Sequence, residues 1–324
     1  GAPDSYIPFD LAAQLTQRPA AHLHIARDDA RMGAIAAAMK FLAPAIEVIE
    51  IPAWDCLPYD RVSPHGEIVS RRIAGLARLA ETSANAETGR LILTTVNGIL
   101  QRLPPVSFFT AAQLQLKPAQ AISVAEIQSF LSSNGFRRAD TVREPGEYAI
   151  RGGIIDVFPS AVGEPVRIDF FGDDIDSMRH FDAMTQLTTG PCTELIFRPV
   201  DEFLLDDDAI QRFRSGYRAH FGGDAHDDPL YEAVSAGQRY AGMDHWLPLF
   251  HSELAVLTDY LGTPDLTFDH QVPDMVDSRF EQIGEFYEAR EIAAKVRQRG
   301  GDGVAYRALP TESLYLRNLE WQAL

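Results

Sequence analysis

Cysteine, net positive charge and long apolar runs are all scarce in this chain of 324 residues. Its two cysteines, Cys56 and Cys192, cannot build a disulfide framework and lack the spacing of zinc ligands, which favours a reducing compartment. The longest apolar runs are far shorter than a membrane span, and the N-terminus lacks the basic region and apolar core of a signal peptide. The sequence therefore predicts a cytoplasmic protein, and its length predicts two or three domains.

Basic residues are outnumbered by acidic ones over the chain as a whole. There are 29 lysines and arginines against 46 aspartates and glutamates, and the formal net charge is −17. Nucleic acids are bound mainly through cations that neutralise phosphates, so we expect this chain to repel DNA overall. Arg71, Arg72 and Arg78 fall at helical spacing, and we interpret them as the solvated face of an amphipathic helix in preference to a basic patch.

The common catalytic and metal-binding motifs are also missing. The sequence has no Gly-x-Ser-x-Gly elbow, no His-Glu-x-x-His pair and no glycine fingerprint after a strand, which argues against acyl and hydride transfer. His22 and His24 share one face of a predicted strand, but no third ligand accompanies them, so we interpret them as surface histidines. A second group lacks the spacing of a calcium loop and is interpreted as a solvated linker: Asp224, His226, Asp227 and Asp228. We predict no catalytic residue and no metal site.

What the sequence does contain is an alternation of strands and helices over its first hundred residues. We expect strands at 21–26, 46–51 and 90–96, with helices at 28–42 and 63–79. Asp28 or Asp29 can cap the first of these helices. This order predicts a parallel sheet covered by helices on both faces.

The pattern changes after the Pro104-Pro105 pair. A capping box at Ser123 and Glu126 predicts a helix that stops at Asn134 and Gly135. Strands are expected next at 148–150, 153–158 and 166–171, separated by glycines and prolines. The chain then becomes helical again, with helices expected at 210–221, 229–236 and 280–299 and a strand at 266–269. The middle segment reads as an inserted α+β domain.

The strand at 166–171 places two kinds of side chain on opposite faces. Arg167 and Phe171 share one face with Asp169, because side chains alternate along a strand. Arg151, after Ile150, is expected to point outward as well. An arginine fork beside an aromatic ring is typical of an interface, so we interpret this face as a docking surface. Two alternatives are that Arg167 pairs with Asp169 or Asp156, and that Phe171 is part of the core.

Three motifs carry a family resemblance. They are WDCLPYDRVSPHGEIVSRR at 54–72, EPGEYAIRGGIIDVFPSAVGEPVRIDFFGDDIDSMRHFD at 144–182 and AGMDHWLPLFH at 241–251. In this order they closely resemble the transcription-repair coupling factor Mfd, and more loosely the excision repair protein UvrB. Members of this family are far longer than this chain, so the resemblance implies an N-terminal piece of one.

The resemblance implies a fold and a division into domains. The fold class is α/β: a degenerate helicase-like, P-loop NTPase-like and UvrB-like parallel-sheet domain with an inserted small α+β domain. Residues 1–108 and 199–324 would form the two parts of the sheet domain, and residues 109–198 the insertion.

The nucleotide site that such a fold implies is degenerate in this sequence. Related proteins bind ATP through a glycine-rich loop that ends in Lys and Ser or Thr, whereas residues 1–6 supply neither the lysine nor a hydroxyl in a Gly-Lys-Thr context. Asp269 can occupy the magnesium-holding position after a strand, but His270 stands where a catalytic glutamate would be needed. We expect no enzymatic activity and no cofactor here, with ATP and magnesium belonging to the motor domains of the parent protein.

The resemblance also implies the partners. Matched residue by residue, the family's UvrA-binding positions are Arg151, Arg167 and Phe171, and Arg179 is an additional candidate for which a salt bridge is the favoured role. The C-terminal domains of the parent chain are expected to mask this face, and RNA polymerase and DNA are expected to be contacted only by domains outside this chain. The alternative is a UvrB-like module that itself binds nucleotide or DNA.

Overall fold

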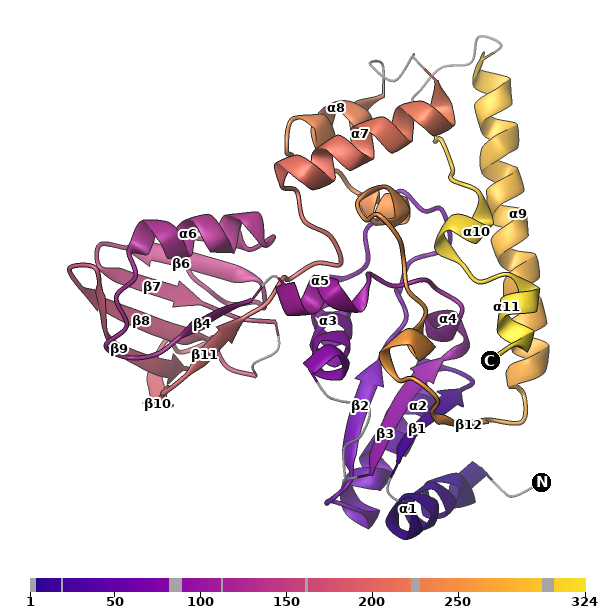
Figure 1. Cartoon of the computed structure of the whole chain (residues 1–324), viewed down its shortest axis with the longest axis horizontal. Coiled ribbons are helices and arrows are strands. Elements are labelled where there is room, and N and C mark those ends of the chain that lie inside the picture. The colour runs from indigo at the N-terminus through magenta and orange to yellow at the C-terminus, as the bar shows by residue number, and fades with distance from the viewer. Residues whose placement is uncertain are drawn as a thin grey trace.

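The computed structural model describes residues 4–18, 20–81, 89–111, 113–160, 163–222, 228–298 and 306–324. Figure 1 shows a smaller part, built around a twisted sheet and helix α6 (Val124–Ser133), beside a larger part that contains both chain ends. The two parts lie next to each other near helices α3 (Gly66–Glu81) and α5 (Val106–Ala111). No helix in the described ranges is long and apolar enough to cross a bilayer.

A four-stranded parallel sheet forms the base of the larger part. Its strands are β1 (Ala21–Ala26), β2 (Glu47–Ile51), β3 (Arg90–Thr95) and β12 (Asp265–Phe268), in the order β12-β1-β3-β2. Helices α1 (Ile7–Gln17) and α2 (Asp29–Leu42) pack on one face, and α3 (Gly66–Glu81) packs on the other. The predicted α/β fold with a covered parallel sheet is confirmed.

Strand β12 brings the last third of the chain back to the first third. It pairs with β1 over the register His22 to Asp265 through Ile25 to Phe268. The chain therefore leaves the larger part, builds the smaller one and returns. This path agrees with the interrupted first domain implied by the resemblance, while the boundaries at 108 and 198 stay predictions.

The smaller part is a six-stranded sheet with one helix. Its order is β10-β9-β8-β7-β6-β5, for β5 (Arg137–Arg138), β6 (Glu147–Arg151), β7 (Ile154–Val157), β8 (Val166–Phe171), β9 (Asp174–Phe181) and β10 (Thr188–Pro191). Helix α6 (Val124–Ser133) packs Ile127 and Leu131 into the core beneath the sheet. Its capping box is present as predicted: Ser123 and Glu126 bond each other's backbone N–H groups.

The smaller part is tied to the larger part by a short antiparallel ribbon. Strand β4 (Leu114–Leu116) brings the chain in and β11 (Leu195–Phe197) takes it out, with Leu114 opposite Phe197. Glu81, at the end of α3, accepts hydrogen bonds from Gln113 just before β4 and from Arg198 just after β11. One carboxylate thus holds both ends of the insertion.

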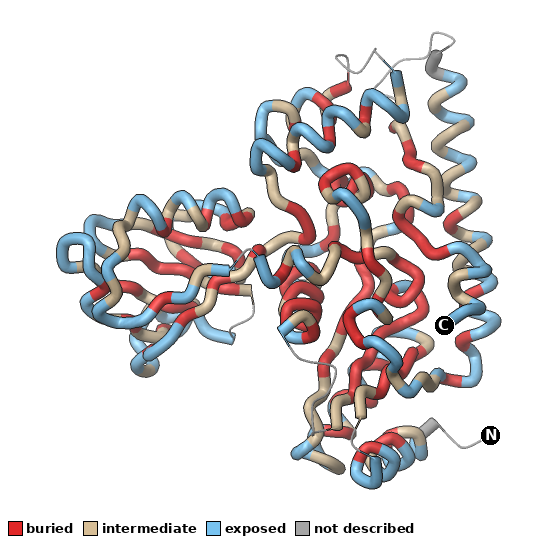
Figure 2. The backbone as a smooth tube through the Cα atoms, viewed as in Figure 1, coloured by how far each residue is buried: buried red, intermediate tan, exposed pale blue. Residues whose placement is uncertain are grey.

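The remaining helices divide between the core under α3 and a second, largely aromatic core. They are α4 (Val96–Ile99), α5 (Val106–Ala111), α7 (Asp207–Phe221), α8 (Pro229–Ser235), α9 (Val272–Gln298), α10 (Thr311–Leu314) and α11 (Asn318–Gln322), with 3-10 turns at Asp4–Tyr6, Met243–Leu249 and Leu257–Tyr260. Helices α7, α8 and α10 enclose the second core together with the middle of α9. Tyr59 and Phe213 are among the fully buried rings of this core. Figure 2 shows that the outer face of α9 stays exposed along most of its length. Helix α9 begins at Val272, earlier than the predicted Phe280, and Arg299 lies outside the described residues.

Two sequence-based interpretations are wrong because their partners are distant in sequence. Of the three arginines interpreted as a solvated helix face, Arg71 and Arg78 are exposed, but Arg72 is 0% exposed and its Nε lies 2.6 Å from a carboxylate oxygen of Glu202. His22 and His24 are buried, and each places a ring nitrogen within 2.9 Å of Thr267 Oγ1 on β12. A histidine needs such a polar partner when it is buried.

The acidic group near residue 226 is only partly described. Asp224, His226 and Asp227 lie outside the described residues. Asp228 is buried and caps α8 through a 2.9 Å hydrogen bond from the backbone N–H of Leu230. This residue is therefore a helix cap, not part of a solvated linker. Among the described residues, no three His, Cys, Asp or Glu side chains are grouped as metal ligands.

Candidate partner-binding face

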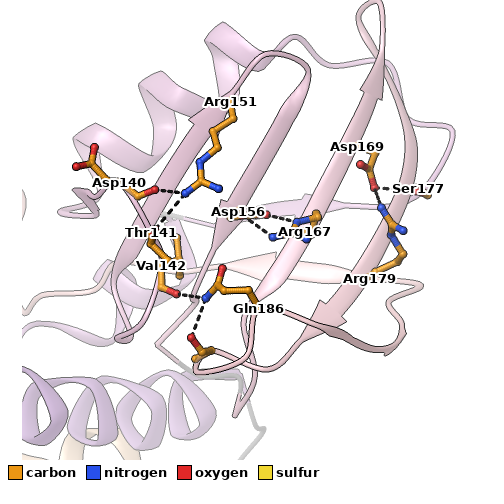
Figure 3. A network of polar contacts seen from close by, with 11 residues as sticks. Asp140, Thr141, Val142, Arg151, Asp156, Arg167, Asp169, Ser177, Arg179 and Gln186 are labelled. Carbon is orange, nitrogen blue, oxygen red and sulfur yellow. Dashed lines mark hydrogen bonds and ion pairs between the residues drawn. The ribbon is translucent and has the colours of Figure 1, made fainter.

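The outer face of the six-stranded sheet carries the predicted docking residues. The alternation along β8 buries Val166 and Ile168 in the core shared with α6 and turns Arg167 to the opposite face. Across the sheet, Arg167 lies opposite Asp156 on β7 and opposite Arg179 on β9. Figure 3 shows these side chains side by side on one face.

Arg167 is held in place by an ion pair and an aromatic ring. Its Nε and Nη2 donate to the two carboxylate oxygens of Asp156, at 2.6 and 2.8 Å. Its guanidinium lies over the ring of Phe181, 4.9 Å from the centroid. The hydrogen bonds to Asp156 raise the pKa of Arg167, so it stays charged. The alternative pairing with Asp156 is thus realised, and it leaves Arg167 half-buried in one fixed orientation.

A second ion pair lies beside the first. Arg179 Nη2 donates to Asp169 at 2.6 Å, and the hydroxyl of Ser177 donates to the same carboxylate oxygen at 3.1 Å. The favoured salt-bridge role of Arg179 is therefore present. Its side chain is 43% exposed, so a partner can still reach it.

Phe171 and Arg151 both lie where their strands end, beyond these pairs. Phe171 is 82% exposed, so the alternative that it belongs to the core is wrong. It follows a bulge between Asp169 and Phe170, where the register to β9 shifts by one residue. Arg151 is exposed, and its Nη2 donates to the backbone oxygen of Asp140 and to the hydroxyl of Thr141. The structure brings Arg167 and Arg179 into direct neighbourhood and places Phe171 and Arg151 at the rim.

No pattern in the sequence pointed to the segment that borders this face. Residues 140–142 cross beside the sheet, where Val142 packs with Ala149 and Phe181 in a small apolar cluster. The amide of Gln186 donates to the backbone oxygen of Val142 at 3.0 Å and so fixes this segment to the β9–β10 turn (Figure 3). These contacts hold the ring of Phe181 beneath Arg167.

The second candidate region is the carboxyl edge of the parallel sheet. Strand β1 enters α2 through Arg27 and Asp28, so this connection, and not residues 1–6, stands where a phosphate loop would lie. Gly1 to Pro3 lie outside the described residues. The carboxylate of Asp28 caps α2 by accepting from Arg31 N–H at 2.7 Å. A negative side chain therefore occupies the helix end that a phosphate would need.

Asp269 follows β12 directly, as predicted, and it is enclosed by the protein. Its Oδ2 accepts from the backbone N–H of Arg27 at 3.0 Å, and its Oδ1 lies 3.5 Å from Arg31 Nε and 3.6 Å from His24 Nε2. Burial alone would raise the pKa of Asp269, but these bonds and charges outweigh it and lower the pKa to about 2. The carboxylate is ionised and compensated by side chains of its own domain. His270, next along the chain, is exposed.

A cysteine and a histidine also meet in the larger part. Cys56 Sγ lies 3.8 Å from His245 Nε2. Burial raises the pKa of Cys56 to about 12 and lowers the pKa of His245 to about 4. Both groups are therefore neutral at pH 7, whereas a nucleophilic pair needs the thiolate. This contact is part of the aromatic core.

Comparisons with known proteins agree with these regions. A family model described as the UvrB interaction domain matches residues 114–203, which begin at β4 and end just beyond β11. The chain is 34% identical over 281 residues to the transcription-repair-coupling factor of Rickettsia bellii, covering 86% of this chain and 24% of that protein. It is 36% identical over 271 residues to the transcription-repair-coupling factor of Escherichia coli, covering 83% of this chain and 22% of that protein. The chain thus spans about a quarter of the length of these relatives.

Proposed function

Since this chain belongs to the transcription-repair-coupling factor family, we propose that it is an adaptor that recruits UvrA to lesions where RNA polymerase has stalled. The resemblance of its motifs supplies the partner. The observation that supports the proposal is the arrangement on β8: an arginine held in one orientation by Asp156 and Phe181, and an exposed phenylalanine four positions further on the same strand.

This arrangement has the physical properties of a binding hot spot. The ion pair to Asp156 fixes Arg167 before a partner arrives, so little side-chain freedom is lost on binding. Phe171 removes a large apolar area from water when it enters a pocket on the partner. Arg151 adds a charge that no carboxylate of a described residue neutralises within an ion pair. Hot spots typically combine aromatic and arginine side chains of this kind.

We further propose that the adaptor works without nucleotide chemistry of its own. At the edge where a related fold would bind ATP, Asp28 caps α2 and Asp269 is bonded to Arg27. ATP and magnesium would then act only in motor domains of a longer parent protein. Those domains would contact RNA polymerase and DNA, and C-terminal domains would mask the UvrA-binding face until the protein is remodelled. The second candidate, a UvrB-like module that binds nucleotide or DNA, draws its support from the position of Asp269 after β12.

A calorimetric titration of UvrA into the chain tests the adaptor, with Phe171→Ala as the first variant. We expect this variant to lose about 2 kcal/mol of binding free energy, which is about 30-fold in Kd. Phe41→Ala is the matched control, because Phe41 is 86% exposed on α2 of the larger part. The control should bind UvrA as the unmodified chain does.

Two results would contradict the proposal. If the unmodified chain does not bind UvrA at tens of micromolar, the partner is wrong. If Phe171→Ala and Phe41→Ala bind equally well, the face is wrong. A parallel titration with ATP and magnesium addresses the second candidate, for which saturable nucleotide binding is required.

A further inference from the structure

A polar cleft lies at the junction of the two parts, away from the proposed UvrA-binding residues. Its volume is about 750 Å³, and residues from the start of α3, from the smaller part and from the segment 200–244 line it. Arg151, Arg167 and Phe171 are not among the lining residues. Ligand sites of proteins are commonly clefts of about 300–1,000 Å³ at domain interfaces.

The charges around this cleft are unbalanced toward the acidic side. Four carboxylates line it against two guanidinium groups, and the six residues are Glu67, Glu144, Asp201, Asp244, Arg137 and Arg239. Both arginines already have partners: Arg239 pairs with Asp201, and Arg137 lies 3.7 Å from Glu144. The lining therefore retains negative charge after its internal pairs are formed.

Asp244 is the residue whose bonding is incomplete. Asp244 is only 7% exposed, and no described residue donates a hydrogen bond to its Oδ2. Ser63 bonds the carboxyl group, and the hydroxyl of Ser63 in turn accepts from Gly242 N–H at 3.0 Å. Burial raises the pKa of Asp244 and raises that of Asp201 to about 6, although the charge of Arg239 opposes the shift at Asp201. A buried carboxylate oxygen without a donor is costly, so a cation brought into this cleft would relieve it.

The apolar walls narrow the kind of cation that fits. Pro64, Val69, Pro145 and Val200 line the cleft beside the carboxylates. Arginine and lysine side chains combine an aliphatic stem with a charged head, which suits a surface of this mixed character. A hydrated metal ion would not use the apolar walls. We propose that this cleft binds the side chain of an arginine or lysine carried by a polypeptide partner.

An NMR titration of the full chain, deuterated and labelled with nitrogen-15, tests this site. The probes are N-acetyl-arginine amide, Nα-acetyl-lysine amide and N-acetyl-citrulline amide, the last being a neutral copy of arginine. We expect saturable shifts at Gly135 and Gly146, which line the cleft, with one of the two cations. Citrulline should bind at least tenfold more weakly, and the arginine and lysine arms identify the preferred head group.

Two variants test whether the carboxylate of Asp244 is the group that binds the cation. Asp244→Asn keeps the shape of the side chain and should weaken cation binding at least tenfold, while Asp208→Asn, in the first turn of α7, should leave it unchanged. If Asp244→Asn does not fold, the comparison of arginine with citrulline on the unmodified chain still tests whether the cleft requires a positive charge. Absence of saturation, equal binding of citrulline, or unchanged binding in a folded Asp244→Asn variant would each overturn the proposal. UvrA binding in the same variant reports separately on the adaptor function.

Discussion

Arginine–aspartate pairs occur at the carboxyl edge of the parallel sheet and on the outer face of the six-stranded sheet, with opposite results. At the first place, Arg31 and the backbone N–H of Arg27 surround the buried carboxylate of Asp269. At the second, the carboxylates of Asp156 and Asp169 lie beneath the arginines, and the guanidinium groups are left at the surface.

The acid is the more buried partner in both regions, and the difference lies in the arginine, whose side chain is 10% exposed at Arg31 but 21% exposed at Arg167 and 43% exposed at Arg179. Where the acid is enclosed, as at Asp269, its oxygens are bonded to or paired with groups of the same domain. Where the acid anchors a cation at the surface, the pair presents an oriented donor to a partner. The same residue types thus enclose a carboxylate in one region and leave oriented guanidinium groups at the surface in the other.

Replacing one aspartate in each region should give the largest difference between the two regions, measured as the loss in the free energy of unfolding. Asp269→Ala leaves Arg31 and His24 without their shared carboxylate, and we expect a loss of about 3 kcal/mol in the free energy of unfolding. Asp169→Ala, on the open face, should cost less than about 1 kcal/mol. Urea unfolding curves measure both. Equal losses would mean that the two pairs are not different in kind.

Changing the shape of a cation should affect binding more than folding. Arg167→Lys retains the charge but cannot bond both oxygens of Asp156, so we expect UvrA affinity to fall about 10- to 30-fold. Calorimetry measures the affinity, and an unfolding curve should stay within about 1 kcal/mol of the unmodified chain. A lysine variant with full affinity would show that only charge matters at this position.

The pH dependence of stability should distinguish Asp269 from Asp201, the carboxyl group that lines the cleft. The pKa of Asp269 is lowered to about 2, so its stabilisation is present above its unfolded pKa of about 3.9 and is lost as pH falls toward 2. The pKa of Asp201 is raised to about 6, so its contribution is largest below about pH 4 and is lost as pH rises through 6. We expect effects of about 1–2 kcal/mol. Unfolding curves between pH 3 and 7 give the free energy of unfolding against pH. Asp269→Asn should make this free energy less dependent on pH at the acidic end, and Asp201→Asn should do so near pH 6.

The smallest effect is expected from two matched surface pairs. Arg179–Asp169 and Arg71–Glu50 are similar in exposure, with arginines 43% and 45% exposed. Replacing either arginine with alanine should change the free energy of unfolding by about 0–1 kcal/mol. Only Arg179→Ala should weaken UvrA binding, because only Arg179 lies beside Arg167. A loss of binding in Arg71→Ala would place part of the interface on the larger part.

Local signals in the sequence predicted much of the fold. The strands at 21–26 and 166–171 have the predicted bounds, and Asp28 and Ser123 cap the expected helices. The alternation along β8 also gave the correct faces for Arg167 and Phe171. These features depend on residues near one another in the chain, where side-chain period and capping chemistry are decisive.

Contacts between distant segments could not be predicted in this way. From its helical spacing Arg72 was predicted to be a surface arginine. In the structure it pairs with Glu202 in the core, and Trp54 Nε1 donates to the same carboxylate at 2.8 Å. His24 likewise acquires its partner only when β12 returns beside β1. Three strands of the six-stranded sheet were not predicted: β5 and β10 are short or polar and leave little pattern to read, whereas β9 is eight residues long and was missed despite its length.

The ribbon of β4 and β11 determines how a pull on the smaller part would reach the rest of the molecule. Both strands leave from the same end, and Glu81 holds Gln113 and Arg198 at that end. Tension between a docked partner and the larger part therefore stretches the two strands together, in the same direction. The hydrogen bonds between them carry little of this load, because neither strand slides past the other. The covalent backbone bears it, so the joint can transmit mechanical force without being unzipped.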